Sequence, residues 1–169
     1  MDSQIFYFVL FQNMLLKFGS THFNFLSESM NLPSDRSELE NKMESEPGSL
    51  WIVKPPGKNN GSGIHVINQV GEIPNTDEDI CVQRYITNPY LIKGCKFDLR
   101  IYVLVTSLEP LKIYIYDDGL VRFAVNEYTL DPEQIKDKQI HVTNFDVNKK
   151  SDKFLPNDNP LEPEGHKWT

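Results

Sequence analysis

The sequence predicts an α+β fold made mostly of antiparallel strands with a few helices. Two observations predict it. Short runs rich in β-branched and aromatic residues recur from residue 50 onward, with Gly, Pro, Asn and Asp clustered between them. Apolar residues at helical spacing occur before them. The chain's 169 residues suffice for one domain with its own core.

Helices are expected in two places before residue 50. The first spans 5–18, where phenylalanine and leucine recur at helical spacing. The second spans 36–44, and Asp35 is expected to cap it because aspartate is among the preferred N-cap residues. Pro47 and Gly48 should end it, since neither residue readily continues a helix.

Strands are expected at 50–53, 64–67, 81–86 and 96–106. The glycine-rich stretch "WIVKPPGKNNGSGI", residues 51–64, would then connect the first two. A hairpin is expected between 113–116 and 120–123, because "DDG" is a typical tight-turn sequence. Beyond it, "LDPEQIKDKQ" should form a short helix or a polar turn, and the Pro-, Asp- and Asn-rich stretch after residue 150 should be a loop.

Charge and composition argue against some classes of function. The formal net charge is −7 at pH 7 and no basic stripe is visible, so no nucleic-acid partner is expected. The apolar run 5–11 is far shorter than the roughly 20 residues of a membrane-spanning helix, and no membrane partner is expected. Cys81 and Cys95 lack metal-site spacing and are expected to be free thiols of a reducing compartment.

The strand "KFDLRIYVLV" carries charges at alternate positions. Lys96, Asp98 and Arg100 should share one face, because successive side chains of a strand point to opposite sides. The other face should lie in a core; it holds Phe97, Leu99, Ile101 and Val103. Tyr102 and Leu104 continue the charged face as apolar residues. This pattern favours a partly buried polar cleft over a solvated edge.

Arg122 and the glycine-rich stretch each leave two interpretations open. Arg122 lies between Val121 and Phe123, where it could fork onto a carboxylate or phosphate or be a surface arginine. The stretch matches neither GxxxxGK[ST] nor GxGxxG. It could still lay backbone N–H groups over phosphates beside Lys54, but an ordinary turn fits the spacing equally well.

The motifs taken together resemble the tubulin–tyrosine ligase-like family, and within it the polyglutamylases. They occur in the family's order, and are "FNFLSESMNLPSD", "WIVKPPGKNNGSGI", "VQRYITNPYLIKGCKFDLRIYVLVTSLEPLKIYIYDDGLVRFA", "HVTNFDVNKK" and "GHKW". The resemblance covers residues 16–169, which we take as part of the ligase domain. Segment 1–15 resembles nothing in the family.

The resemblance implies an ATP-grasp-like fold and an ATP-dependent ligase. ATP would phosphorylate a glutamate side chain in a tubulin tail, and free L-glutamate would attack the acyl phosphate. Tubulin tails and microtubules are the implied partners. The implied location is the cytoplasmic microtubule cytoskeleton, including the basal body of the cilium. Preference for α- or β-tubulin, chain initiation or elongation, non-tubulin acceptors and oligomeric state stay open.

The resemblance also implies roles for individual residues. Arg100 would lie near the transferred phosphate, and Arg122 would hold the carboxylate of the incoming amino acid. Phe145 and Lys149 would lie near the glutamate. ATP would be held by a larger set, namely Lys54, Asn60, Gly61, Ser62, Gly63, Ile64, Gln83, Arg84, Tyr85, Ile86, Lys96, Asp98, Thr143 and Asn144.

Several positions depart from the family's pattern. Asn60 stands where the family has an arginine, so Lys58 is a candidate replacement cation. The family's Tyr-Ser pair is Phe145 and Asp146 here. No residue of this chain is assigned to metal, because the family's magnesium ligands lie downstream of "GHKW", and we expect this chain alone to be inactive. The alternatives are a non-catalytic relative that binds nucleotide or tubulin, and a cytosolic β-rich interaction domain.

Overall fold

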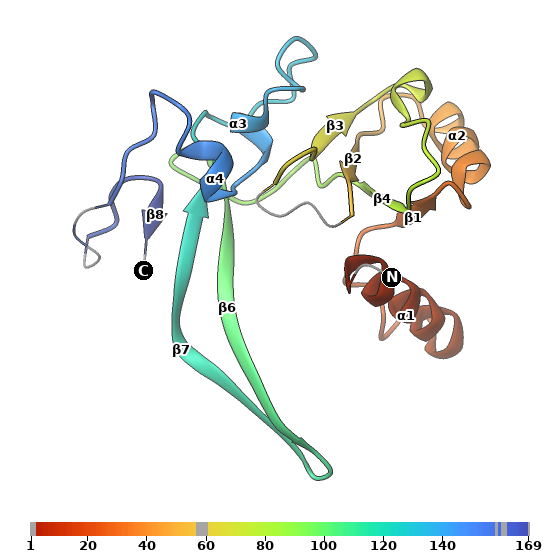
Figure 1. Ribbon diagram of the computed structural model, residues 1–169, viewed down its shortest axis with the longest axis horizontal. Helices are drawn as coiled ribbons and strands as arrows, with labels where there is room; N and C mark the ends of the chain where they lie inside the picture. Colours follow the sequence, from red (N-terminus) through yellow and green to blue (C-terminus); the bar gives the residue numbers. More distant parts are fainter. Residues whose placement is uncertain (1–2, 57–60, 158, 160–161, 169) are drawn as a thin grey trace. The chain divides into compact units, whose positions relative to one another are not determined.

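The computed structural model describes residues 3–56, 61–157, 159 and 162–168. The chain divides into two compact units, Met1–Pro89 and Tyr90–Thr169. Each unit contains a four-stranded antiparallel sheet (Figure 1). The predicted α+β class, with mostly antiparallel strands and few helices, is confirmed.

Unit 1 has its sheet in the strand order β1-β4-β2-β3. Its elements are α1 (Ser3–Phe18), β1 (Ser29–Leu32), α2 (Arg36–Ser45), β2 (Trp51–Lys54), β3 (His65–Ile67), the 3-10 turn η1 (Val70–Glu72) and β4 (Ile80–Arg84). Both predicted helices and all three predicted strands of this region are present. The glycine-rich stretch connects β2 to β3, which pair antiparallel, as expected.

The core of unit 1 lies between α2 and the sheet. Leu39 and Met43 of α2 are buried in one cluster with Trp51, Val53 and Val82 of the central strands. Their spacing of four residues places the two α2 side chains on one helical face. This packing fixes β2 and β4, which carry three of the predicted nucleotide residues of this unit, namely Lys54, Gln83 and Arg84.

Asp35 precedes α2, where its side chain was expected to cap the helix. That expectation is wrong, because the side chain makes no capping hydrogen bond. Its Oδ2 instead accepts a hydrogen bond from the backbone N–H of Asn31 at 2.7 Å. The Asp35 N–H donates to Asn31 O at 2.8 Å, and Ser34 Oγ donates to the same oxygen at 2.9 Å. The carboxylate is therefore used to close the tight connection between β1 and α2.

The first helix, α1, packs through aromatic side chains. Phe11 meets Phe23 and Phe25 edge-on, with ring centroids 6.1 and 5.0 Å apart. Among the residues that the structure describes, no helix combines the length and the apolar character needed to cross a bilayer.

Unit 2 has its sheet in the strand order β5-β6-β7-β8. Its elements are β5 (Leu91–Ile92), β6 (Cys95–Leu108), β7 (Leu111–Phe123), α3 (Lys138–His141), α4 (Phe145–Asn148) and β8 (Lys167–Trp168). The predicted strand 96–106 is confirmed within β6. The stretch 132–136 forms the polar turn that was one of two expectations there. The short elements β5, α4 and β8 were not predicted, and the stretch that holds β5 was expected to be a turn and loop.

The hairpin predicted around "DDG" is wrong. β7 is continuous through Asp117, Asp118 and Gly119, and the actual turn between β6 and β7 lies at 109–110. Ile101 pairs with Gly119 whereas Val103 pairs with Ile115, so the "DDG" stretch forms an irregularity within the ladder. Such a bulge accommodates extra residues on one strand without reversing the chain.

Gly119 is needed where the bulge brings β7 against β6. A Cβ at this position would lie 2.6 Å from the backbone oxygen of Arg100. We therefore expect Gly119→Ala to lower the free energy of unfolding by about 1–3 kcal/mol, measured by chemical denaturation. Gly71→Ala is the control, because its added Cβ would meet nothing within 4 Å. Equal stability of the two variants would contradict this explanation.

The expectation that one face of β6 lies in a core is wrong along most of the strand. Leu99, Ile101 and Val103 are 58%, 56% and 56% exposed. Figure 1 shows the β6–β7 hairpin extending away from α3 and α4. In the part of the chain that the structure describes, side chains cover the base of the hairpin, where Phe97 packs on Phe123 with ring centroids 5.9 Å apart. Alternation indicates which side chains share a face, but not whether anything covers that face.

Candidate functional site

Lys54 ends β2 and is the first predicted nucleotide residue of unit 1. Its Nζ donates a hydrogen bond to Gln83 Oε1 on β4 at 2.5 Å. Burial lowers the pKa of Lys54. Among the described residues, no carboxylate forms an ion pair with it. Burying an ammonium group without an acidic partner costs free energy. An anionic ligand bound at Lys54 would offset this cost.

The described part of the glycine-rich loop forms a tight turn. Gly61 and Gly63 have φ of 72° and 78°, a region that side-chain-bearing residues rarely adopt. Ile64 N–H donates to Gly61 O at 3.3 Å, and Ser62 is exposed. Asn60 and Lys58 lie outside the described residues. Both glycines are thus required by the backbone, whether or not the loop meets a phosphate.

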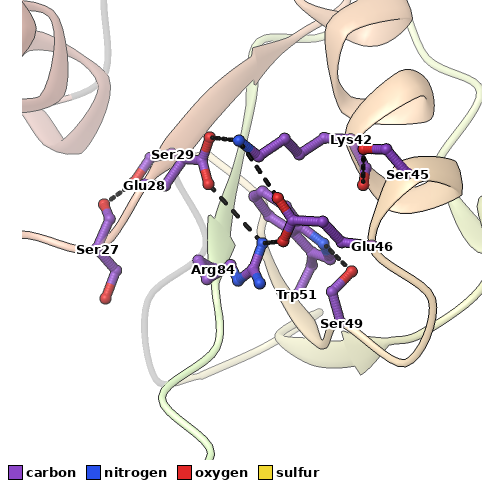
Figure 2. Close-up of polar contacts among 9 residues, drawn as sticks. All are labelled: Ser27, Glu28, Ser29, Lys42, Ser45, Glu46, Ser49, Trp51 and Arg84. Carbon is purple, nitrogen blue, oxygen red and sulfur yellow. Dashed lines mark hydrogen bonds and ion pairs between the residues drawn. The ribbon is translucent and has the colours of Figure 1, made fainter.

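At the end of β4, Arg84 belongs to a four-charge cluster with Glu28, Lys42 and Glu46 (Figure 2). Arg84 pairs closely with Glu46, and its hydrogen bond is the main reason that the pKa of Glu46 is lowered. Lys42 Nζ lies 3.2 Å from Glu28 and 3.4 Å from Glu46. The Arg84 guanidinium also covers the ring of Trp51, 5.4 Å from its centroid.

This cluster directs the Arg84 side chain to acids of its own unit. The backbone that follows is fixed as well, since Tyr85 N–H donates to Leu50 O at 2.8 Å. Tyr85 is buried, whereas Ile86 is exposed. A contact of this segment with adenine would therefore come from its backbone and from Ile86 rather than from the Arg84 guanidinium.

In unit 2 the charged face predicted on β6 is present. Asp98 lies directly opposite Arg122 of β7. Arg122 donates to both oxygens of the Asp98 carboxylate, from Nε at 2.8 Å and from Nη2. This pairing is the main reason that the pKa of Arg122 is raised. Lys96 Nζ donates to the backbone oxygen of His141 at 3.0 Å, which ties the same face to α3.

A pocket of about 260 Å³ opens on this face. It brings together four residues that the sequence analysis had selected from separate motifs, namely Arg100, Arg122, Thr143 and Phe145. Of the three charged residues from which the polar cleft was predicted, Arg100 lines this pocket and Lys96 and Asp98 do not. Tyr102, which also lines it, is half exposed. Asn144 is placed by a local contact, because its Oδ1 accepts from Asp146 N–H at 2.8 Å and so caps α4.

Lys149 does not line this pocket. It pairs with Asp146, and its Nζ lies 5.3 Å from the centroid of the Phe145 ring. Asp146, which stands where the family has a serine, is therefore neutralised by Lys149 at the end of α4. It does not bring an unpaired negative charge to the pocket.

Sequence reasoning missed several residues that line the pocket. Asn148, Phe154, His166 and Lys167 are among them. The "GHKW" motif, for which the sequence predicted no role, supplies His166 and Lys167. On α3, burial lowers the pKa of His141 to about 4, so that its ring is neutral at neutral pH. Among the described residues, no group of three or more His, Cys, Asp or Glu is placed to hold a metal ion.

Comparison with known proteins decides the family. A model described as "Tubulin-tyrosine ligase family" matches residues 4–169. The chain belongs to this family. The match includes most of segment 1–15, and a domain boundary at residue 16 stays a prediction. The fold described above, with antiparallel sheets and few helices, is consistent with the ATP-grasp-like α+β class expected for tubulin–tyrosine ligase relatives.

The chain is similar to curated members of the tubulin–tyrosine ligase family. It is 44% identical over 155 residues to mouse tubulin monoglutamylase TTLL4, covering 92% of this chain and 13% of that protein. It is 41% identical to human tubulin polyglutamylase TTLL5, covering 95% and 13%. It is 35% identical to the probable alpha-tubulin polyglutamylase Ttll1 of Tetrahymena thermophila, covering 88% and 38%. The chain thus spans well under half of these relatives.

Proposed function

We propose that this chain forms part of an ATP-dependent ligase that adds glutamate to glutamate side chains of tubulin tails. The observation that carries the proposal is the pocket of unit 2, where Arg100 and Arg122 from one motif meet Thr143 and Phe145 from another. Similarity to proteins named as tubulin glutamylases supports the choice of substrate.

The residues of unit 1 fit the phosphates of ATP. Lys54 is a partly buried cation held by Gln83 and without a carboxylate partner among the described residues. A lysine in such a position can offer a point charge to a phosphate. Gly61 and Gly63 allow the neighbouring loop to turn tightly, so that its N–H groups can approach the same ligand.

The residues of unit 2 fit the transferred phosphate and the incoming amino acid. Arg100 lines the pocket, and no described carboxylate pairs with it. Arg122 is oriented by Asp98, which aligns its guanidinium for a second carboxylate. Thr143 and Asn144 would contact ATP beside them, and Phe145 would form an apolar wall for the glutamate.

ATP, when bound, supplies the phosphoryl group that activates the acceptor carboxylate; the amine of free L-glutamate then displaces phosphate from it. The chain's own residues bind, orient and neutralise charge. The described residues offer no cluster that fits magnesium. The expectation that this chain alone transfers no glutamate stays a prediction.

The partners and location of the whole protein follow from this proposal. The acceptors would be the acidic tails of tubulin in microtubules, and the protein would act on the cytoplasmic cytoskeleton and at the basal body of the cilium. A chain that binds ATP and tubulin without joining glutamate to it would instead be a non-catalytic relative.

Replacement of Lys54 tests the nucleotide site. We expect Lys54→Met to weaken binding of Mg-ATP about tenfold, because the variant loses a cation at the phosphates. Its stability should be unchanged or higher, since an apolar side chain removes the cost of burying an unpaired charge. Calorimetric titration with Mg-ATP and thermal unfolding measure the two effects.

Lys112→Met serves as the matched control, because Lys112 is exposed on β7 and lies outside the predicted site. It should bind Mg-ATP like the parent chain. If the parent chain releases no heat with millimolar Mg-ATP, or if Lys54→Met binds ATP as well as the parent does, the proposed nucleotide site is wrong.

A further inference from the structure

We propose that Glu46 is a positioning residue for the nucleotide site of unit 1, and that it acts through Arg84. Its carboxylate would hold the end of β4 so that the backbone of 85–86 lies where adenine would meet it. This inference rests on the proposed function, and it gives a role in ATP binding to a residue that would itself touch no ligand.

The sheet places the side chains of Gln83 and Arg84 on opposite faces. Trp51 of the core lies directly opposite Arg84, and Ile52 lies opposite Gln83. Successive side chains of a strand point to opposite sides. Gln83 therefore shares a face with Lys54, to which it is hydrogen-bonded, whereas Arg84 lies over the Trp51 ring on the side of α2. An effect of Arg84 on a nucleotide at Lys54 thus passes through the backbone.

Three segments of unit 1 meet at the Arg84 guanidinium (Figure 2). Glu46 comes directly after α2 and pairs closely with it, and Glu28, which precedes β1, lies 3.9 Å away. Lys42 of α2 contacts both carboxylates and so holds them in place. A network of several charges supported by an aromatic ring is fixed more firmly than an isolated surface ion pair.

The backbone at the end of β4 depends on the same residues. Arg84 N–H donates to Glu28 O at 2.7 Å, and Tyr85 N–H donates to Leu50 O at 2.8 Å. The pairing of β4 with β2 ends at Arg84, two positions before Ile86. The direction in which the chain leaves the sheet is therefore set at Arg84. Without the Glu46 carboxylate, the guanidinium could turn away and the backbone of 85–86 could shift.

A purely structural role of the cluster would have a different consequence. Lys54 lies on β2, which pairs with β4, so a general loosening of this strand pair would weaken every ligand of the site. A shift confined to 85–86 would affect the base of ATP and leave the phosphates in place. A ligand made of phosphates alone distinguishes the two roles.

The test compares Mg-ATP with Mg-tripolyphosphate, which has the phosphates without the nucleoside. Both are titrated into the parent chain, Glu46→Gln and Glu46→Asp, and binding is followed by calorimetry. Glu46→Gln should bind Mg-ATP about threefold to fivefold more weakly than the parent, as expected for the loss of a partly exposed ion pair. It should bind Mg-tripolyphosphate like the parent. Glu46→Asp keeps the carboxylate and should retain most of the affinity for Mg-ATP.

Removal of Arg84 shows whether Glu46 acts through it. In an Arg84→Gln background, the further change Glu46→Gln should leave the affinity for Mg-ATP unchanged, because the effects of two directly coupled residues do not add. Glu40→Gln is the matched control, since it removes a similarly exposed ion pair, that of Glu40 with Arg36 on the same helix. It should bind both ligands like the parent.

The positioning role is overturned if Glu46→Gln binds Mg-ATP like the parent, if it weakens both ligands equally, or if its effect persists without Arg84. An equal loss of Mg-ATP binding in Glu40→Gln would also overturn it, because the effect would then be general. A parent chain that binds neither ligand would refute the proposed nucleotide site itself. A parent that binds both, with Glu46→Gln unchanged, would refute the positioning role alone.

Discussion

Replacing Arg122 with alanine should raise the dissociation constant for L-glutamate about 100-fold, which is far more than it raises that for Mg-ATP. The reason is the geometry of the guanidinium. Asp98 holds it through two hydrogen bonds, so that it is already oriented when a ligand carboxylate arrives. Calorimetric titration of the two ligands into the same protein measures the difference.

The change to alanine also frees Asp98, which is predicted to lie at the ATP site. An unpaired carboxylate there would repel the phosphates of ATP and so weaken ATP binding by an effect unrelated to the lost guanidinium. The double variant Arg122→Ala with Asp98→Asn removes that charge and should bind ATP like the parent. Arg122→Lys keeps the positive charge but loses the two-pronged hydrogen bonding of the guanidinium. Its dissociation constant for L-glutamate should lie between those of the parent and of Arg122→Ala. Equal losses for glutamate and ATP in the double variant would refute the assigned role.

Replacing Trp51 with alanine should lower the free energy of unfolding of unit 1 by about 3–5 kcal/mol. Trp51 is 0% exposed and belongs to the core between α2 and the sheet. Its loss would leave a large cavity and would also remove the surface on which the Arg84 guanidinium lies. The ion pairs of Arg84 with Glu46 and Glu28 are partly exposed and cannot compensate for such a loss.

The two tryptophans make this effect easy to assign. The other tryptophan, Trp168, belongs to unit 2 and packs on Phe123 with ring centroids 4.5 Å apart. In Trp51→Ala, fluorescence therefore reports on unit 2 alone, while circular dichroism follows both units. Trp51→Phe is the control and should lose much less stability. If Trp51→Ala unfolds at the parent's denaturant concentration, the described core is wrong.

Local sequence was sufficient to predict which residues share a face. Strict alternation placed Lys96, Asp98 and Arg100 together, and the structure agrees. The partner of Asp98 could not be predicted in this way, because the register between β6 and β7 depends on the bulge near Gly119. The prediction of a turn at "DDG" was wrong for the same reason. The pairing of β7 with β6 continues through these residues, although they are typical of a turn.

Other features were invisible because they depend on distant contacts. β8 is too short to show a strand pattern, and it exists through its pairing with Val121 and Arg122. His166 and Lys167 reach the pocket only through that pairing. The exposure of Leu99, Ile101 and Val103 was missed because an apolar strand face indicates burial on average, whereas the described residues leave this hairpin uncovered.

Nuclear magnetic resonance can show, residue by residue, whether the pocket of unit 2 receives glutamate. Backbone amide signals of the labelled chain are recorded during titration with L-glutamate. We predict shifts at Arg122, Thr143, Phe145 and Asn148, and none along 104–113 at the far end of the hairpin. Shifts confined to residues outside the pocket, or no saturable shift at any residue, would show that this pocket does not receive glutamate.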